Sequence, residues 1–147
     1  MRTRLASTFS LGLATLLAVT ACGEKARGGD PTTRTGSRAV AVTQIDLGRS
    51  LNTDLTIKDN TDTFRPSDVI YASVETKGSG SATLGARWTD GNNQLIDETS
   101  RTISASDEPA RTEFHISKTD GWPQGKYKVT VFVNGTEAGS KDFEVKR

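Results

Sequence analysis

The sequence predicts an all-β protein: a two-sheet antiparallel sandwich of about seven strands over residues 40–147, preceded by a signal peptide and a disordered tether. Two observations lead to this fold class. Apolar residues recur at every second position in several short segments, and no window shows a helical stripe of ten or more residues. The segments follow one another at intervals of about 10–15 residues, which is the rhythm of a small β-sandwich.

The segment 125–145 predicts the clearest pair of strands. Its first half places core-facing residues at spacing two, namely Tyr127, Val129, Val131 and Val133. Asn134–Gly135 follows, a pair that favours a type I′ turn because both central residues need positive φ. Phe143 and Val145 continue the period on the returning strand. We therefore expect a β-hairpin across this segment.

Five further segments show the same period less regularly, over residues 38–48, 67–76, 82–91, 94–103 and 111–118. The residues expected in the core are Val40, Val42, Ile45 and Leu47, then Ile70, Ala72 and Val74, then Leu84, Ala86 and Trp88, and finally Phe114 and Ile116. With the hairpin, these segments make seven predicted strands. Two packed antiparallel sheets would bury their apolar faces against each other.

Two aromatic residues carry a resemblance to a known fold. Trp88 falls on the third predicted strand, and Tyr127 begins the next-to-last strand directly after the segment "DGWPQG". In immunoglobulin-like domains a tryptophan from the third strand fills the core, and a tyrosine near the start of the sixth pins the adjacent corner through its hydroxyl. The domain resembles bacterial Ig-like and fibronectin-III-like modules. It lacks the two inter-sheet cysteines of antibody domains, since Cys22 is the only cysteine.

The N-terminus has the features of an export signal. Arg2 and Arg4 precede an apolar run from Leu5 to Val19. This run is shorter than the about 20 residues that a membrane-spanning helix needs, so it indicates the core of a signal peptide. Val19, Thr20 and Ala21 then stand directly before Cys22, which resembles the lipobox of bacterial lipoproteins.

The resemblance implies cleavage before Cys22, a diacylglycerol on its thiol and a third acyl chain on its new amine. Two or three chains anchor stably, since each buried methylene contributes about 0.8 kcal/mol. An ordinary cleaved signal peptide with a free thiol and an uncleaved N-terminal anchor are the alternatives. In Gram-negative lipoproteins an aspartate after the cysteine retains the protein at the inner membrane. Gly23 stands there, so the resemblance implies the periplasmic face of the outer membrane.

The chain is thus expected to comprise a signal peptide (1–21), a lipidated N-terminus and flexible linker (22–39) and the sandwich domain (40–147). The linker contains the segment "EKARGGDPTTRTGSR", which has no aliphatic residue beyond Ala26. Such a segment cannot bury enough apolar surface to offset its ordering entropy. Its roughly 16 residues would span about 55 Å when fully stretched.

Neither the charge nor the reactive residues indicate an enzyme. Loss of Arg2 and Arg4 leaves 17 basic and 18 acidic side chains, a net charge of −1, and no basic excess that would suggest nucleic acid. His115 is the only histidine, and the alternation on its strand turns it toward solvent. The acidic loop around Asp59 and Asp62 departs from calcium-loop spacing, and "KGSGS" at 77–81 precedes a strand rather than a helix. We expect no cofactor, metal or catalytic site.

Two aromatic residues are candidates for contact with a partner. Phe132 alternates out of phase with the core residues of its strand and should lie on the outer sheet face. Trp122 could lie at the surface, although a cap over the sandwich end beside Tyr127 explains it better. The predicted function is a non-enzymatic envelope lipoprotein that presents its domain to a protein or glycan. The alternative is a spacer without a ligand. Binding predicts a contiguous exposed patch with Phe132 or the end loops, and a spacer predicts an evenly polar surface.

Overall fold

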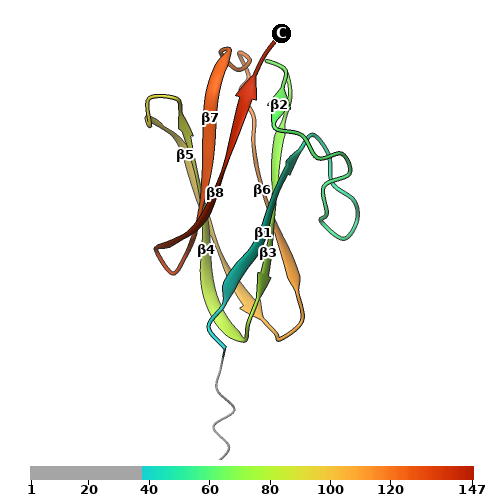
Figure 1. Ribbon diagram of the computed structural model, residues 1–147, viewed down its shortest axis with the longest axis vertical. Helices are drawn as coiled ribbons and strands as arrows, with labels where there is room; N and C mark the ends of the chain where they lie inside the picture. The colour runs from blue at the N-terminus through green and yellow to red at the C-terminus, as the bar shows by residue number, and fades with distance from the viewer. Residues whose placement is uncertain (1–37) are drawn as a thin grey trace, which may run out of the picture. The chain divides into compact units, whose positions relative to one another are not determined.

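The computed structural model describes residues 38–147, which form an all-β immunoglobulin-like sandwich of eight strands in two sheets (Figure 1). The predicted signal peptide, Cys22 and the linker up to residue 37 lie outside the described residues. The strands are β1 (Ala41–Gly48), β2 (Thr63–Phe64), β3 (Ile70–Lys77), β4 (Gly80–Asp90), β5 (Leu95–Ala105), β6 (Ala110–Ile116), β7 (Gly125–Val133) and β8 (Thr136–Val145). Seven of them correspond to the seven predicted segments.

The smaller sheet has the order β1-β3-β6 and the larger one β2-β8-β7-β4-β5. The chain therefore changes sheets between β1 and β2, and β2 pairs in parallel with β8. Sequence periodicity missed β2 because two residues cannot display a period. Phe64 nevertheless anchors it, since its ring is 1% exposed and lies edge to face with Phe143. The strand directly follows Asp62, within the acidic segment that was expected to be a loop.

A β-bulge in β1 explains an irregularity in its apolar pattern. Val42 is an even-numbered position, whereas Ile45 and Leu47 are odd-numbered, so in a regular strand they would point to opposite faces. All three are expected in the core. The register with β3 shifts between Val42 and Gln44, so one extra residue moves the inward face from even to odd positions. Val42 before the bulge and Ile45 and Leu47 after it therefore point to the same face, and all three pack on the core.

The centre of the core is built on predicted residues of three inner strands, β3, β4 and β7. Ile70, Ala72, Val74, Leu84, Ala86, Val129 and Val131 have no measurable exposure, and Trp88 on β4 is 1% exposed. Trp88 packs edge to face against Phe143, with ring centroids 5.9 Å apart. The tryptophan position that carried the resemblance to immunoglobulin-like domains is therefore a core position.

The predicted tyrosine corner is confirmed. The Tyr127 hydroxyl donates a hydrogen bond of 2.7 Å to the carbonyl oxygen of Pro123, which holds the segment before β7 against the sandwich. The Tyr127 ring is stacked on Phe143 and lies edge to face with Trp122, with both centroid distances 5.4 Å. Burial, together with the negative charge of Asp90, raises the pKa of Tyr127.

The hairpin between β7 and β8 has the expected turn. Asn134 has a φ of 51° and Gly135 a φ of 80°, as a type I′ turn requires. The Asn134 side chain also accepts a hydrogen bond of 2.8 Å from the Thr83 amide of the neighbouring strand. The turn is therefore held both by its own backbone and by β4.

Because the strands run up and down, the two ends of the domain differ (Figure 1). Residues 38–40 enter at the end that carries the tight β3–β4 and β7–β8 turns, where the Ser79 amide donates to the carbonyl of Arg38. The opposite end carries the longer connections 49–62 and 117–124 and the C-terminus. No helix that could cross a membrane occurs in residues 38–147.

Candidate functional site

Phe132 lies on the outer face of the five-stranded sheet, as the alternation predicts, but it is half-buried. Its cross-strand partner is Gly85, whose missing side chain leaves room for the ring over the β4 backbone. The guanidinium of Arg87 lies over the ring, with its Cζ 4.7 Å from the ring centroid. Arg87 also donates to both carboxylate oxygens of Glu98, at 3.0 and 3.3 Å. These contacts explain Phe132 structurally.

A shallow hollow of about 210 Å³ remains around this ring, which we call the Phe132 hollow. It is lined by Thr83, Gly85, Arg87, Glu98, Ser100, Phe132 and Gly135. The hollow is small, and it combines the Phe132 ring with the polar side chains of Arg87 and Glu98. The hollow is thus not the contiguous apolar patch that a hydrophobic contact surface requires.

Trp122 has the role of a cap rather than of a surface contact. Its side chain is 2% exposed, and its indole Nε1 donates a hydrogen bond of 3.1 Å to the carbonyl oxygen of Asp68. The Asp68 carboxylate accepts bonds from the Arg65 amide (2.8 Å) and from Nε of Arg49 (2.6 Å). The indole joins the connection 65–69 to the tyrosine corner, so its ring offers no face to a partner in this fold.

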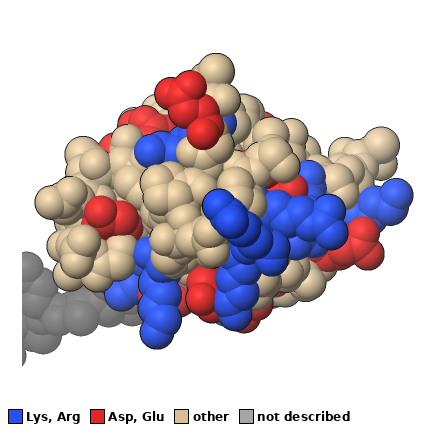
Figure 2. Space-filling view, turned by 90° about the horizontal axis from the view of Figure 1, so that it is seen from above, with Lys and Arg blue, Asp and Glu red and all other residues tan. Residues whose placement is uncertain are grey.

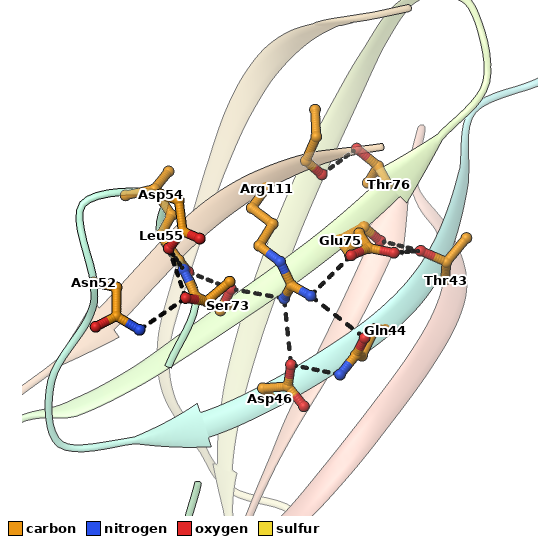
Figure 3. Close-up of polar contacts among 12 residues, drawn as sticks. Thr43, Gln44, Asp46, Asn52, Asp54, Leu55, Ser73, Glu75, Thr76 and Arg111 are labelled. Carbon is orange, nitrogen blue, oxygen red and sulfur yellow. Dashed lines mark hydrogen bonds and ion pairs between the residues drawn. The ribbon is translucent and has the colours of Figure 1, made fainter. Parts of the chain in front are cut away.

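The outer face of the smaller sheet carries a polar cluster that sequence reasoning missed (Figure 3). We call it the Arg111 cluster; it comprises Gln44, Asp46, Ser73, Glu75 and Arg111. One guanidinium nitrogen of Arg111 donates to Asp46 (3.3 Å) and Ser73 (3.2 Å), and the other donates to Glu75 (2.8 Å) and Gln44 (3.4 Å). The cluster joins all three strands of this sheet.

The Arg111 cluster also fixes the connection that follows β1. Ser73, which has no measurable exposure, donates a hydrogen bond of 2.6 Å to the carbonyl oxygen of Leu55 (Figure 3). Leu55 has a φ of 65°, an unfavourable value for a leucine, at a turn closed by a bond from the Asn52 amide to the carbonyl of Thr56. Hydrogen bonds from the Thr56 hydroxyl and amide lower the pKa of Asp54 in the same turn.

Chemically, the Arg111 cluster is a structural clamp. The side chains of Arg111, Asp46 and Glu75 are 16%, 14% and 24% exposed, so most of their surface is removed from water. The guanidinium already binds two carboxylates, a hydroxyl and an amide oxygen. No local motif predicts the cluster, because Asp46 and Arg111 are 65 residues apart in the sequence and come together only through the order of the strands.

The end opposite the chain entry carries a hollow of about 660 Å³, which we call the end groove. It is lined by Asp62, Thr63, Lys126, Tyr127, Asp142, Phe143, Glu144 and Lys146. The rings of Tyr127 and Phe143 are buried, so the groove presents mainly charged groups. Seen from this end, lysine and arginine side chains gather along one side with acidic residues beside them (Figure 2).

The charges of the end groove partly neutralise each other. Lys146 contacts Glu144 at 2.8 Å, and this hydrogen bond raises the pKa of Lys146. Lys128, next to the groove, lies 3.7 Å from Asp142. Because these pairs are exposed, each contributes little to stability and can exchange for a partner's charges.

The remaining candidates lie apart from one another. His115 is exposed; its Nδ1 lies 3.1 Å from Glu113, and its ring lies beside Tyr71 at 5.5 Å. The Asp62 carboxylate accepts a hydrogen bond from the neighbouring Thr63 hydroxyl rather than converging with Asp59. Within residues 38–147, no three His, Cys, Asp or Glu side chains are grouped as metal ligands.

Comparison with known structures finds likenesses at low identity, with TM-scores below 0.5. No family model and no curated protein matches the chain. An immunoglobulin-like protein from Pseudomonas aeruginosa is 13% identical with a TM-score of 0.49, covering 76% of this chain and 99% of that one. An alkylpurine DNA glycosylase from Pseudomonas fluorescens is 16% identical with a TM-score of 0.49, covering 74% of this chain, which spans only 30% of the glycosylase.

A CARDB domain from Pyrococcus furiosus, solved with di-metal ions, is 13% identical with a TM-score of 0.43, covering 76% of this chain and 89% of that one. At such identities the likeness concerns the fold alone. The described domain is an immunoglobulin-like β-sandwich, and its function has to be argued from its own residues.

Proposed function

We propose that the protein is a bacterial envelope lipoprotein, anchored through acyl chains on Cys22, whose immunoglobulin-like domain is a non-enzymatic binding or accessory module. The proposal places it at the periplasmic face of the outer membrane, on the grounds of Gly23 after the cysteine. The sequence of residues 1–22 supports the anchor. Cys22 itself lies outside the described residues.

The difference between the two ends of the domain is the observation that carries this proposal. The chain enters at the end with the tight turns, and the longer connections and the end groove lie at the other end (Figure 1). Strands of nine residues span about 30 Å, so an anchored domain would hold those connections well away from its point of attachment. This arrangement suits a module that presents its far end or its flanks to a partner.

The surface limits the kind of partner. Leu95, at 61% exposure, is the one large hydrophobic residue among 38–147 that is prominently exposed. Phe132 lies under Arg87, and the groove rings are buried. Most small-ligand pockets are lined by exposed apolar and aromatic groups, and the described surface offers few of these. This favours a protein partner, bound through charges and backbone groups, over a glycan. The same polarity favours the second candidate function, a spacer without a ligand.

The anchor is tested by replacing Cys22 in the expressed full chain. Cys22→Ser should move the protein from the membrane to the soluble fraction, and the intact mass of the wild-type protein should include the acyl chains. Gly23→Asp is the matched control: it keeps the thiol, so it should stay membrane-bound and shift from the outer to the inner membrane. Membrane retention of Cys22→Ser would refute the anchor.

Binding is tested by chemical crosslinking in intact envelopes. If the domain is a binding module, we expect a discrete crosslinked product that disappears when the contact surface is altered. If it is a spacer, we expect no such product when the protein is equally abundant. Lys146→Glu together with Lys126→Glu changes the end groove while leaving the buried core intact. Arg38→Glu together with Lys77→Glu, two exposed residues at the opposite end, changes the net charge by the same −4 and is the control for net charge alone.

A further inference from the structure

The five-stranded sheet ends in an unusual edge. Its order places β2 at one edge and β5 at the other, and no described strand pairs with the outer side of β5. The β2 edge is two residues long, whereas β5 runs for eleven. Residues 97–102 are all exposed. Alternate residues of β5 therefore present backbone N–H and C=O groups to solvent along one continuous line.

Some of the usual protections of such an edge are absent here. Natural edge strands avoid pairing through shortness, proline, bulges or charged side chains, including charges on the inner face, and β5 keeps only the charges of Asp97, Glu98 and Arg101 along its exposed middle. β5 contains neither proline nor lysine, and its register shift with β4 lies at its beginning, between the pairs of Trp88 and Thr89. By contrast, β1 at the edge of the smaller sheet is interrupted by a bulge. β6, the other edge of the smaller sheet, has seven residues against the eleven of β5, so β5 is the longest described edge that could accept another strand.

The charges on β5 specify which strand would fit. Asp97 and Arg101 have opposite charges, lie four residues apart and share the inner face, since their β4 partners are Trp88 and Leu84. Within its own domain Arg101 lies 3.9 Å from Glu113 and its guanidinium lies over the Phe114 ring, 5.8 Å from the centroid, while its side chain stays 48% exposed and within reach of a neighbouring strand. A strand running antiparallel should therefore offer a base opposite Asp97 and an acid opposite Arg101.

A second copy of β5 meets this requirement in one register. Two antiparallel neighbours related by a two-fold axis need that axis perpendicular to the sheet, so the register centres on a residue. Centring on Thr99 places Asp97 opposite the other copy's Arg101, twice, with the threonines facing each other. Centring on Glu98 or on Arg101 opposes like charges, and centring on Ser100 pairs no charges.

We propose that two copies of the chain associate through antiparallel pairing of their β5 strands, centred on Thr99, to form one continuous sheet of ten strands. The observation that carries this proposal is the long free edge together with its self-complementary charges. Glu98 of each copy would lie opposite Ser100 of the other on the outer sheet face. The two Phe132 hollows, which these residues help to line, would then flank the seam.

The β5 pairing goes beyond the proposed function, because it uses a flank of the domain and leaves the end groove free for another partner. A lipid anchor would promote the pairing, because confinement to a bilayer raises the effective concentration of one copy around another. The two entry ends would point in opposite directions along the strands. The roughly 16 residues of the linker can reach at most about 55 Å, enough for both anchors to enter a single bilayer.

Disulfide trapping tests the register in the full processed chain in its own membranes. Opposed residues of antiparallel strands have Cα atoms about 4.5 or 5.5 Å apart, within the range of a disulfide. Thr99→Cys should therefore give a covalent dimer on non-reducing gels under mild oxidation. Ser104→Cys is the matched control on the same strand, since its two copies would lie about 33 Å apart. The unaltered chain reports any contribution of Cys22.

A charge swap tests the specificity by sedimentation of the full chain in mild detergent. Arg101→Asp should raise the dissociation constant of the dimer by on the order of tenfold, because both facing pairs become repulsive. Adding Asp97→Arg should restore it to within about threefold of the wild-type value. A structural role of Arg101 beside Glu113 could not be rescued in this way, since the new aspartate still faces that glutamate.

The proposal is overturned if Thr99→Cys remains monomeric, if Ser104→Cys crosslinks equally well, or if the charge swap fails to restore association. The charge swap and the two cysteine variants are each compared at the same state of the anchor, and the Cys22→Ser fractionation reports acylation separately. Failure of the lipid anchor and failure of the β5 pairing can therefore be told apart.

Discussion

The tyrosine corner offers the sharpest test of how the domain is held together. Tyr127→Phe removes one hydroxyl and keeps the ring that packs on Trp122 and Phe143. The loss comprises the hydrogen bond of 2.7 Å and the pairing of the Pro123 carbonyl in a part-buried corner. A net hydrogen bond contributes about 0.5–1.5 kcal/mol and an unsatisfied buried acceptor costs about 1–3 kcal/mol. Because some water can reach this corner, we expect a loss of about 1.5 kcal/mol in the free energy of unfolding.

The assay is equilibrium unfolding in urea, followed by the fluorescence of the buried Trp88 and Trp122. The mature chain without its lipid, with Cys22→Ser, serves as the reference. Tyr127→Ala is the comparison variant; it also removes the ring and should cost about 3–5 kcal/mol. The reasoning is refuted if Tyr127→Phe unfolds like the reference, or if it is as unstable as Tyr127→Ala.

The raised pKa of Tyr127 adds an alkaline signature. Burial disfavours the phenolate, so the folded state keeps its proton after the unfolded tyrosine, with a pKa near 10.0, has lost its own. The stabilisation is complete below the unfolded pKa and is lost as the pH rises through the folded pKa. The reference chain should therefore lose stability above about pH 10, and Tyr127→Phe should lose less over the same range.

Three further changes probe other parts of the domain. Arg111→Leu leaves two half-buried carboxylates without their cation. Breaking a fully buried ion pair costs about 3–5 kcal/mol, so this change should lower the free energy of unfolding in urea by about 2–3 kcal/mol. A loss below about 0.5 kcal/mol would contradict the clamp. Burial opposes ionisation of Asp68, but the Arg65 amide and Arg49 together lower its pKa, so its contribution is present above about pH 4 and is lost on acidification. Melting temperatures between pH 6 and 3 should accordingly fall less for Asp68→Asn than for the wild-type chain. Gly135→Ala, at a φ of 80°, should destabilise the hairpin by about 1 kcal/mol in the same urea assay, and no change would argue against the type I′ turn.

Local pattern predicted much of the fold and little of the polar surface. The positions of Trp88, Tyr127 and the Asn134–Gly135 turn could be predicted because each depends on neighbouring residues or on strand alternation. Phe132 was placed on the correct face, but its partners Gly85 and Arg87 could not be foreseen. Their contact depends on which strands become neighbours, and on their register.

What the sequence determined by itself is therefore the strand period, the core residues and the hairpin turn, since pleating and backbone sterics act over a few residues. The pairing of β2 with β8, the joining of three strands by Arg111 and the free edge of β5 appear only once the chain is folded. These features arise from the order of strands in the sheets. That order depends on burying both sheets' apolar faces together, and no short segment encodes it.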